Sequence, residues 1–212
     1  LVGEWTGPDA ASGKLRFGPP PESTAFTPTQ CSTWGDFKQW ASDVRSKDDA
    51  VYFRGHGDRR FKLETTLYRA GRTRIERYCS EVLREFKLHA EAVLGMRFDF
   101  DDAEDYATVL GLAQHHGLPT PLLDWTGSPY VAAFFAFADA LEASNSRPEA
   151  THVRVYALAR EFVANTSPNL VTWPKVNPVV ATVTISPRHN PRLYAQQGKF
   201  LVTNVGDLET YL

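Results

Sequence analysis

The densest group of residues that could do chemistry lies in the middle of the chain. Residues 114–129 read QHHGLPTPLLDWTGSP. Histidines, an aspartate, a tryptophan and hydroxyl residues surround the apolar pair Leu122 and Leu123, whose character predicts a short buried strand. Polar groups beside a buried strand need hydrogen-bond partners, and a ligand site is one way to supply them. The stretch therefore predicts a binding or catalytic site.

The polar residues of this stretch also have structural interpretations. Asp124 could act as an acid or base, or it could accept hydrogen bonds from the turn amides of residues 126–128. Trp125 and Tyr130 could stack on a planar ligand or pack in the core. Ser128, ahead of a proline, is a good helix N-cap. The sequence alone leaves these alternatives open.

The adjacent histidines argue against a metal centre. His115 and His116 diverge by about 100° on a helix, and no HExxH or CxxC pattern accompanies them. We therefore expect no metal site. A metal-dependent nuclease or hydrolase that uses both histidines and Asp124 is a third interpretation, which unchanged activity in EDTA would exclude.

Two smaller clusters lie far from this stretch in sequence. Residues 53–57 read FRGHG, in which the arginine suits the phosphate or carboxylate of a ligand, or a structural ion pair. Gln196 and Gln197 precede Gly198 and a strand. Their amides can bond a sugar hydroxyl, or the segment can be a short helix ended by the glycine. The sequence contains no P-loop and no GxSxG elbow.

The elements that must position these clusters follow from the spacing of apolar residues. The predicted helices cover 73–94, 103–115 and 129–142, with another after Thr33, and the predicted strands cover 50–54, 153–158, 179–185 and 200–203. Residues 56–72 are expected to be irregular. Helices dominate the first two-thirds and strands the last third. The expected fold class is therefore α+β, with a helical N-terminal two-thirds packed on a small, mostly antiparallel sheet.

Composition bounds the class of protein. The 212 residues are 42% hydrophobic and 23% charged, as in an ordinary globular chain. A net charge of -2 argues against bulk electrostatic binding to nucleic acid or an anionic membrane. Cys31 and Cys79 lack metal-type spacing and are expected to be free thiols in a reducing, cytoplasmic compartment. Residues 1–30, rich in Gly, Pro, Ser and Thr, are expected to be an arm or linker before one α+β domain over 31–212.

Three motifs, taken in order, resemble the FRG domain family. They are FRG at residues 53–55, QHHGLPTPLLDWT at residues 114–126 and QQGKF at residues 196–200. The resemblance spans about residues 34–205. The middle motif is long and specific, whereas the outer two motifs support the resemblance only because they occur in this order. The resemblance implies a bacterial or phage-borne protein.

The FRG family is in turn similar to the ADP-ribosyltransferase superfamily. This second resemblance implies an ADP-ribosyltransferase-like fold, with NAD as the substrate. Arg54 matches the residue that faces NAD in the first superfamily motif. Thr126 or Ser128, with Tyr130 behind, matches the second motif beside the nicotinamide.

The third superfamily motif departs from this sequence. Gln197 or Gln196 stands where the superfamily has a glutamate, which holds the ribose and stabilises positive charge as the nicotinamide bond breaks. A glutamine can bond the ribose, but it carries no charge. Asp124 is the residue that could supply the missing carboxylate.

The resemblance thus implies a set of site residues. The implied catalytic residues are Arg54, Thr126, Gln197 and Asp124. The implied cofactor-binding residues are Arg54, Gly55, His116, Trp125, Ser128, Tyr130 and Gln196. Arg54 would hold the diphosphate or the nicotinamide ribose. Thr126 and Tyr130 would shape the nicotinamide pocket, and Gln197 would bond the ribose.

The implied function is the transfer of ADP-ribose from NAD to a protein or nucleic-acid target. The protein would be a toxin or a phage-defence effector, with an antitoxin or regulatory partner and no membrane association. The competing hypothesis is a non-catalytic module that recognises a nucleotide or a partner protein in the same cleft. The missing glutamate favours the module, whereas the density of polar residues in the middle motif favours the enzyme.

Overall fold

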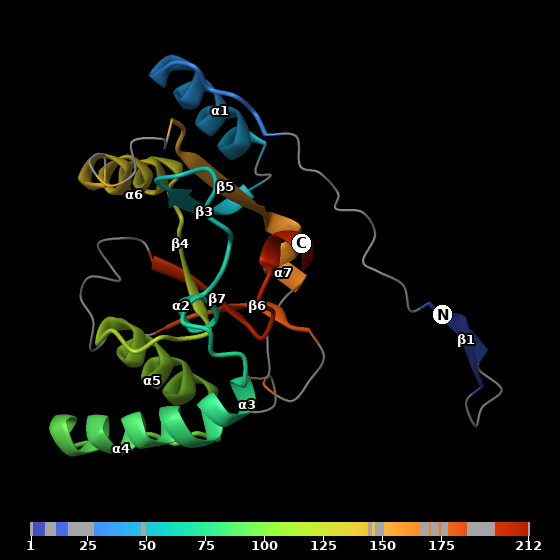
Figure 1. The fold of residues 1–212 in the computed structure, drawn as a ribbon, viewed down its shortest axis with the longest axis vertical. Helices are drawn as coiled ribbons and strands as arrows, with labels where there is room; N and C mark the ends of the chain where they lie inside the picture. The colour runs from blue at the N-terminus through green and yellow to red at the C-terminus, as the bar shows by residue number, and fades with distance from the viewer. Residues whose placement is uncertain are drawn as a thin grey trace.

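The computed structural model is α+β and is built on one five-stranded antiparallel sheet of order β5-β3-β4-β7-β6 (Figure 1). The strands are β3 (Ala50–His56), β4 (Leu122–Thr126), β5 (Arg154–Ala159), β6 (Val180–Val183) and β7 (Gly198–Thr203). The structure describes residues 2–6, 12–16, 28–47, 50–143, 146, 151–165, 170, 174, 178–185 and 198–211. The predicted α+β class and antiparallel sheet are confirmed.

The sheet consists of two groups of strands, β5-β3 and β4-β7-β6, that meet at a single residue pair. β3 pairs with β5 along its length, and β4 pairs with β7 along its length. Between β3 and β4, which are both fully described, one residue pair forms, Phe53 with Thr126. The residues after Phe53 and before Thr126 therefore have no ladder between them, and the two strands separate there.

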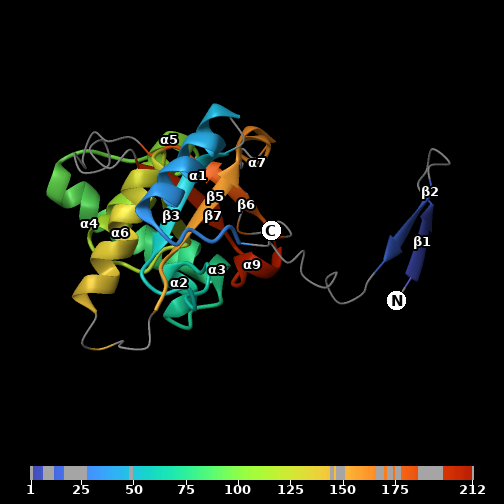
Figure 2. The ribbon, with the colours of Figure 1, turned by 90° about the horizontal axis from the view of Figure 1, so that it is seen from above.

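The helices lie on both faces of the sheet (Figure 2). They are α1 (Trp34–Ser46), α2 (Thr66–Arg69), α3 (Ile75–Arg77), the π-helix η1 (Tyr78–Val82), α4 (Leu83–Leu94), α5 (Ala103–His115), α6 (Pro129–Glu142), α7 (Arg160–Asn165) and α9 (Leu208–Tyr211). None of these described helices is both long and apolar enough to cross a membrane.

Two hydrophobic clusters form the core. Because side chains alternate along a strand, β4 contributes to both clusters. Leu122 packs with the buried residues of α5, η1 and α4. Leu123 and Trp125 pack on the other face with Leu201 and with Leu208 of α9. The apolar pair of the middle motif is thus a buried strand, as the sequence predicts.

The helices on either side of β4 coincide with their predicted bounds. α5 covers Ala103–His115 and α6 covers Pro129–Glu142. The Ser128 side chain accepts a hydrogen bond from the Val131 amide, so the predicted N-cap of α6 is confirmed. β4 is therefore held at both ends by helices that begin and end at defined residues.

Other segments differ from the prediction. The helix predicted over 73–94 begins at Ile75 and contains the π-turn η1, which apolar spacing does not reveal. The segment 56–72, expected to be irregular, contains α2. β3 continues past Gly55 to His56. Within the predicted arm 1–30, β1 (Val2–Thr6) and β2 (Ser12–Arg16) pair into a separate two-stranded sheet that the sequence did not predict.

Candidate functional site

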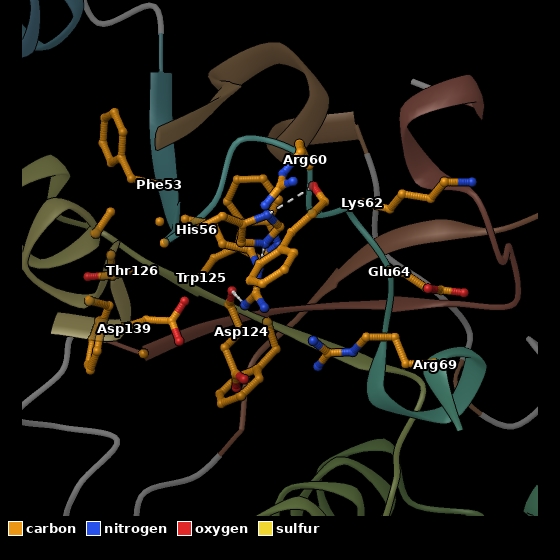
Figure 3. Close-up of a pocket in the computed structure, with 18 residues that line it drawn as sticks. Phe53, His56, Arg60, Lys62, Glu64, Arg69, Asp124, Trp125, Thr126 and Asp139 are labelled. Carbon is orange, nitrogen blue, oxygen red and sulfur yellow. Dashed lines mark hydrogen bonds between the residues drawn. The ribbon is translucent and has the colours of Figure 1, made fainter. Parts of the chain in front are cut away.

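A cavity of about 700 Å³ opens where β3 and β4 separate (Figure 3). It is lined by β3, the segment 57–64, the end of α2, β4, α6 and the start of β7. Its volume lies in the range of clefts that bind small molecules and cofactors. The gap in the sheet thus provides a candidate site.

Arg54 ties the two separated strands together. Its Nε donates to His56 Nε2 at 3.1 Å, and its Nη1 donates to the backbone carbonyl of Asp124 at 2.5 Å. The second bond crosses the gap between β3 and β4. Burial lowers the pKa of Arg54 from its ordinary value, whereas the neighbouring Asp124 carboxylate raises it. A guanidinium has so high an intrinsic pKa that it stays charged here.

Asp124 presents its carboxylate to the cavity. Solvent reaches this group through the cavity, while protein encloses it on the other sides. Its Oδ1 accepts a hydrogen bond from Gln114 Nε2, and Gln114 Oε1 accepts one from Thr120 Oγ1. Desolvation raises the pKa of Asp124, and the Arg54 charge and the Gln114 hydrogen bond oppose that rise. Such a carboxylate can accept a proton or stabilise a nearby positive charge.

One of the turn amides after β4, that of Ser128, does not bond to Asp124. The Ser128 amide donates instead to Thr126 Oγ1 at 3.2 Å. The structural interpretation of Asp124 as a turn acceptor is therefore wrong for this amide, because Thr126 is nearer in the chain. Thr126 is buried and lines the cavity.

His56 is held as a neutral imidazole. Its Nε2 accepts from Arg54, so its Nδ1 carries the proton and faces the Phe61 carbonyl at 3.4 Å. Burial, followed by the Arg54 charge, lowers the pKa of His56 to about 4. A protonated His56 would point a second cation at Arg54. The Arg54–His56 contact therefore exists only while His56 is neutral.

The lowered pKa of His56 predicts that acid reduces the stability of the fold. Unfolded His56 binds a proton below pH 6.5, whereas folded His56 does so only below about pH 4. Between these values acid favours the unfolded chain, and the free energy of unfolding should fall by about 3 kcal/mol. Urea titrations at several pH values measure the effect. This loss of unfolding free energy should disappear in His56→Gln. It should persist in the control His89→Gln, which changes an exposed position. If the free energy of unfolding falls equally with pH in wild type and in His56→Gln, the prediction is contradicted.

The structure brings together several residues of the predicted set. The members that line the cavity are Arg54, Gly55, Asp124, Trp125 and Thr126. Trp125 is buried, and its indole Nε1 has no hydrogen-bond partner in the described part of the chain. Two motifs separated by about 70 residues in sequence therefore meet at one cavity.

Three members of the set lie elsewhere. His116 is exposed at the end of α5, where its ring contacts His115 and Phe86. Ser128 is occupied as the cap of α6. Tyr130 is exposed on α6 beside Trp34 of α1. The cavity walls do not include any of these three side chains.

The paired glutamines lie outside the described residues. Gln196 and Gln197 directly precede Gly198, which begins β7 and lines the cavity. The described part of the third motif therefore reaches the cavity, because Gly198 and Phe200 line it.

Five charged lining residues were not identified from the sequence, namely Arg60, Lys62, Glu64, Arg69 and Asp139. Asp139 lies on the face of α6 that also carries Ala132 and Phe135, a helical spacing that the sequence does show. Arg69 ends α2. Its only sequence signal is the basic composition of residues 59–72. Among the described residues no group of three or more His, Cys, Asp or Glu side chains is arranged to hold a metal ion.

Comparison with protein families gives one finding. The family model described as FRG domain matches residues 49–145. This match contains the FRG tripeptide and the middle motif and is shorter than the span of 34–205 expected from the motifs. The motif at 196–200 lies outside it. Comparisons with curated proteins and with solved structures give no match.

Proposed function

This chain contains an FRG domain, and from that premise we propose that it is an NAD-dependent ADP-ribosyltransferase. The observation that carries the proposal is the meeting of Arg54, Asp124 and Thr126 at one cavity of cofactor-binding size. An arginine and a carboxylate that face the same space suit a substrate with an anionic diphosphate and a cationic nicotinamide. The sheet that separates between two strands would be the ADP-ribosyltransferase-like part of the fold.

The proposed reaction breaks the bond between ribose C1′ and the nicotinamide nitrogen. The bonding electrons leave with nicotinamide, which departs neutral, and positive charge develops on the ribose ring. A nucleophile on the target then forms the new bond to C1′ and loses its proton. The enzyme must therefore stabilise a transient cation beside C1′.

Asp124 is suited to this stabilisation. Its Oδ1 is fixed by Gln114, and its carboxylate is open to the cavity. A charge held in place by the fold needs no reorganisation as the cation forms. Asp124 would thereby replace the glutamate of the third superfamily motif, and Gln197 would bond the ribose. Thr126 would bound the nicotinamide pocket, and Arg54 would face the nicotinamide ribose.

The acceptor is proposed to be a protein or a nucleic acid. An enzyme of this kind would serve as a toxin or a phage-defence effector, and a cell that carries it would need an antitoxin or regulatory partner. Free NAD as the donor is consistent with a cytoplasmic site of action.

The test is release of free nicotinamide when the protein is incubated with NAD, with and without cell lysate as a source of target. We expect release, and we expect Arg54→Ala to abolish it; this loss supports the enzyme provided that the variant still melts near wild type. NAD binding without release under either condition would overturn the enzyme and leave the non-catalytic module.

A further inference from the structure

We propose that Arg69, and not Arg54, binds the diphosphate of the dinucleotide. Naming the ligand as NAD rests on the proposed function above, whereas an anion site at Arg69 stands on the geometry alone. The chemical class of ligand is a diphosphate ester. The subsite lies in the cavity wall at the end of α2.

Arg54 has two of its five N–H donors committed within the protein. Its Nε is bonded to His56 and its Nη1 to the Asp124 carbonyl. Forked recognition of a phosphate needs two neighbouring N–H groups on one side of the guanidinium. The fork that includes Nε is therefore taken up at the junction of β3 and β4, which leaves Arg54 less able than a free guanidinium to bind a phosphate.

Arg69 has its guanidinium available. The side chain is exposed and lines the cavity, and within the described part of the chain it makes no hydrogen bond or ion pair. Figure 3 shows its guanidinium directed toward the centre of the cavity, on the side of Asp124. Five unused donors in a planar fork form a ready receptor for phosphate oxygens.

The charge of Arg69 acts on Arg54 and His56 and also on Asp124. Its charge lowers the pKa of Arg54 and of His56, which is the effect of a like charge placed close by. Asp124 is nearby, but its carboxylate bonds to Gln114 and forms no ion pair with Arg69 among the described residues. A bound diphosphate would offset the repulsion between the two arginines.

α2 holds Arg69 at a fixed place relative to Asp124. The Leu67 amide and Thr66 Oγ1 donate to the Thr120 carbonyl, and the Thr120 amide donates to Thr66 Oγ1. Thr120 Oγ1 also donates to Gln114, which holds Asp124. One residue therefore fixes both the proposed anion site and the carboxylate, as a site for two parts of one ligand requires.

The other cations of the wall are less suited. Arg60 forms a salt bridge with Asp58. Lys62 also lines the cavity, but Figure 3 shows its ammonium directed away from the cavity centre. Figure 3 also places Asp139 on the side opposite Arg69. A dinucleotide with its diphosphate toward Arg69 would therefore extend across the cavity toward the side on which Asp139 lies.

The experiment is calorimetric titration of the full chain with ADP, and separately with adenosine, which lacks phosphate. We expect Arg69→Ala to weaken ADP binding by at least about tenfold and to leave adenosine binding unchanged. Lys62→Ala removes the same charge from the same wall and should change ADP affinity by less than about twofold. Because Arg69 is exposed, its removal should not alter the melting temperature.

The outcomes separate the two proposals. Failure of wild type to bind ADP, unchanged ADP affinity in Arg69→Ala, or equal losses in the two variants would each overturn the subsite. If ADP binding depends on Arg69 but NAD yields no nicotinamide, the subsite stands and the enzymatic proposal fails. If NAD yields nicotinamide but ADP affinity is unchanged in Arg69→Ala, the enzymatic proposal stands and the subsite fails.

Discussion

Replacing Asp124 with asparagine is expected to lower the rate of nicotinamide release from NAD by at least about a hundredfold, which is the usual effect of removing one fixed electrostatic group from an active site. Asparagine has nearly the same shape and can still accept the hydrogen bond from Gln114. The bond from Arg54 goes to the backbone carbonyl and is retained. The substitution therefore removes the negative charge and little else.

The fold should tolerate this change. Burial raises the pKa of Asp124, which means that its charged form is costly to enclose, so Asp124→Asn should melt at or above the wild-type temperature. In wild type the rate should fall as the pH drops through this raised pKa, because only the ionised carboxylate stabilises the ribose cation. Initial rates against pH for both proteins measure the two effects.

Glu64→Gln is the matched control for Asp124→Asn. Glu64 also lines the cavity, but Figure 3 shows its carboxylate directed away from the cavity centre. We expect the control to retain most of the wild-type rate. A similar loss in both variants would mean that the net charge of the cavity matters and that Asp124 has no special role. An undiminished rate in Asp124→Asn would remove Asp124 from the mechanism.

Replacing Gly55 with alanine should have the largest effect on stability. A Cβ at this position would lie 1.9 Å from the Ala132 carbonyl oxygen and 2.9 Å from the Ala136 Cβ. The first of these atoms is helix backbone, so relief requires α6 to move away from β3. We expect a loss of about 3 kcal/mol or more, which for a chain of this length lowers Tm by about 10 °C.

Gly206→Ala is the control for Gly55→Ala. The nearest atom to its added Cβ would be Tyr68 Cδ1 at 3.6 Å, an ordinary contact distance, so its free energy of unfolding should change by less than about 0.5 kcal/mol. Thermal melts followed by circular dichroism compare the two variants. If Gly55→Ala has the same melting temperature as wild type, α6 can shift freely over the sheet and the prediction is contradicted.

Local signals explain what could be predicted from the sequence. α5 and α6 have strong apolar spacing, and α6 has a serine cap followed by proline, so their bounds follow from the residues themselves. β4 follows from a short apolar run. The proximity of Arg54 to Asp124 came from the resemblance to a family and not from periodicity, because strand order depends on packing between distant segments.

The remaining features depend on tertiary contacts. β3 was expected to end at Gly55, since glycine commonly ends a strand, yet it continues because that glycine admits α6. α2 spans only four residues and is fixed by bonds from Thr66 to Thr120, more than fifty positions away. Arg69 enters the cavity through that attachment, so no pattern near residue 69 could have identified it.

The family tripeptide has an architectural meaning in this chain. Phe53 forms the single pair that joins β3 to β4, Arg54 spans the gap beyond it, and Gly55 lets a helix rest on the strand. All three residues thus build a joint. The tripeptide of this chain therefore sets the shape of the cavity before any of its residues contacts a ligand.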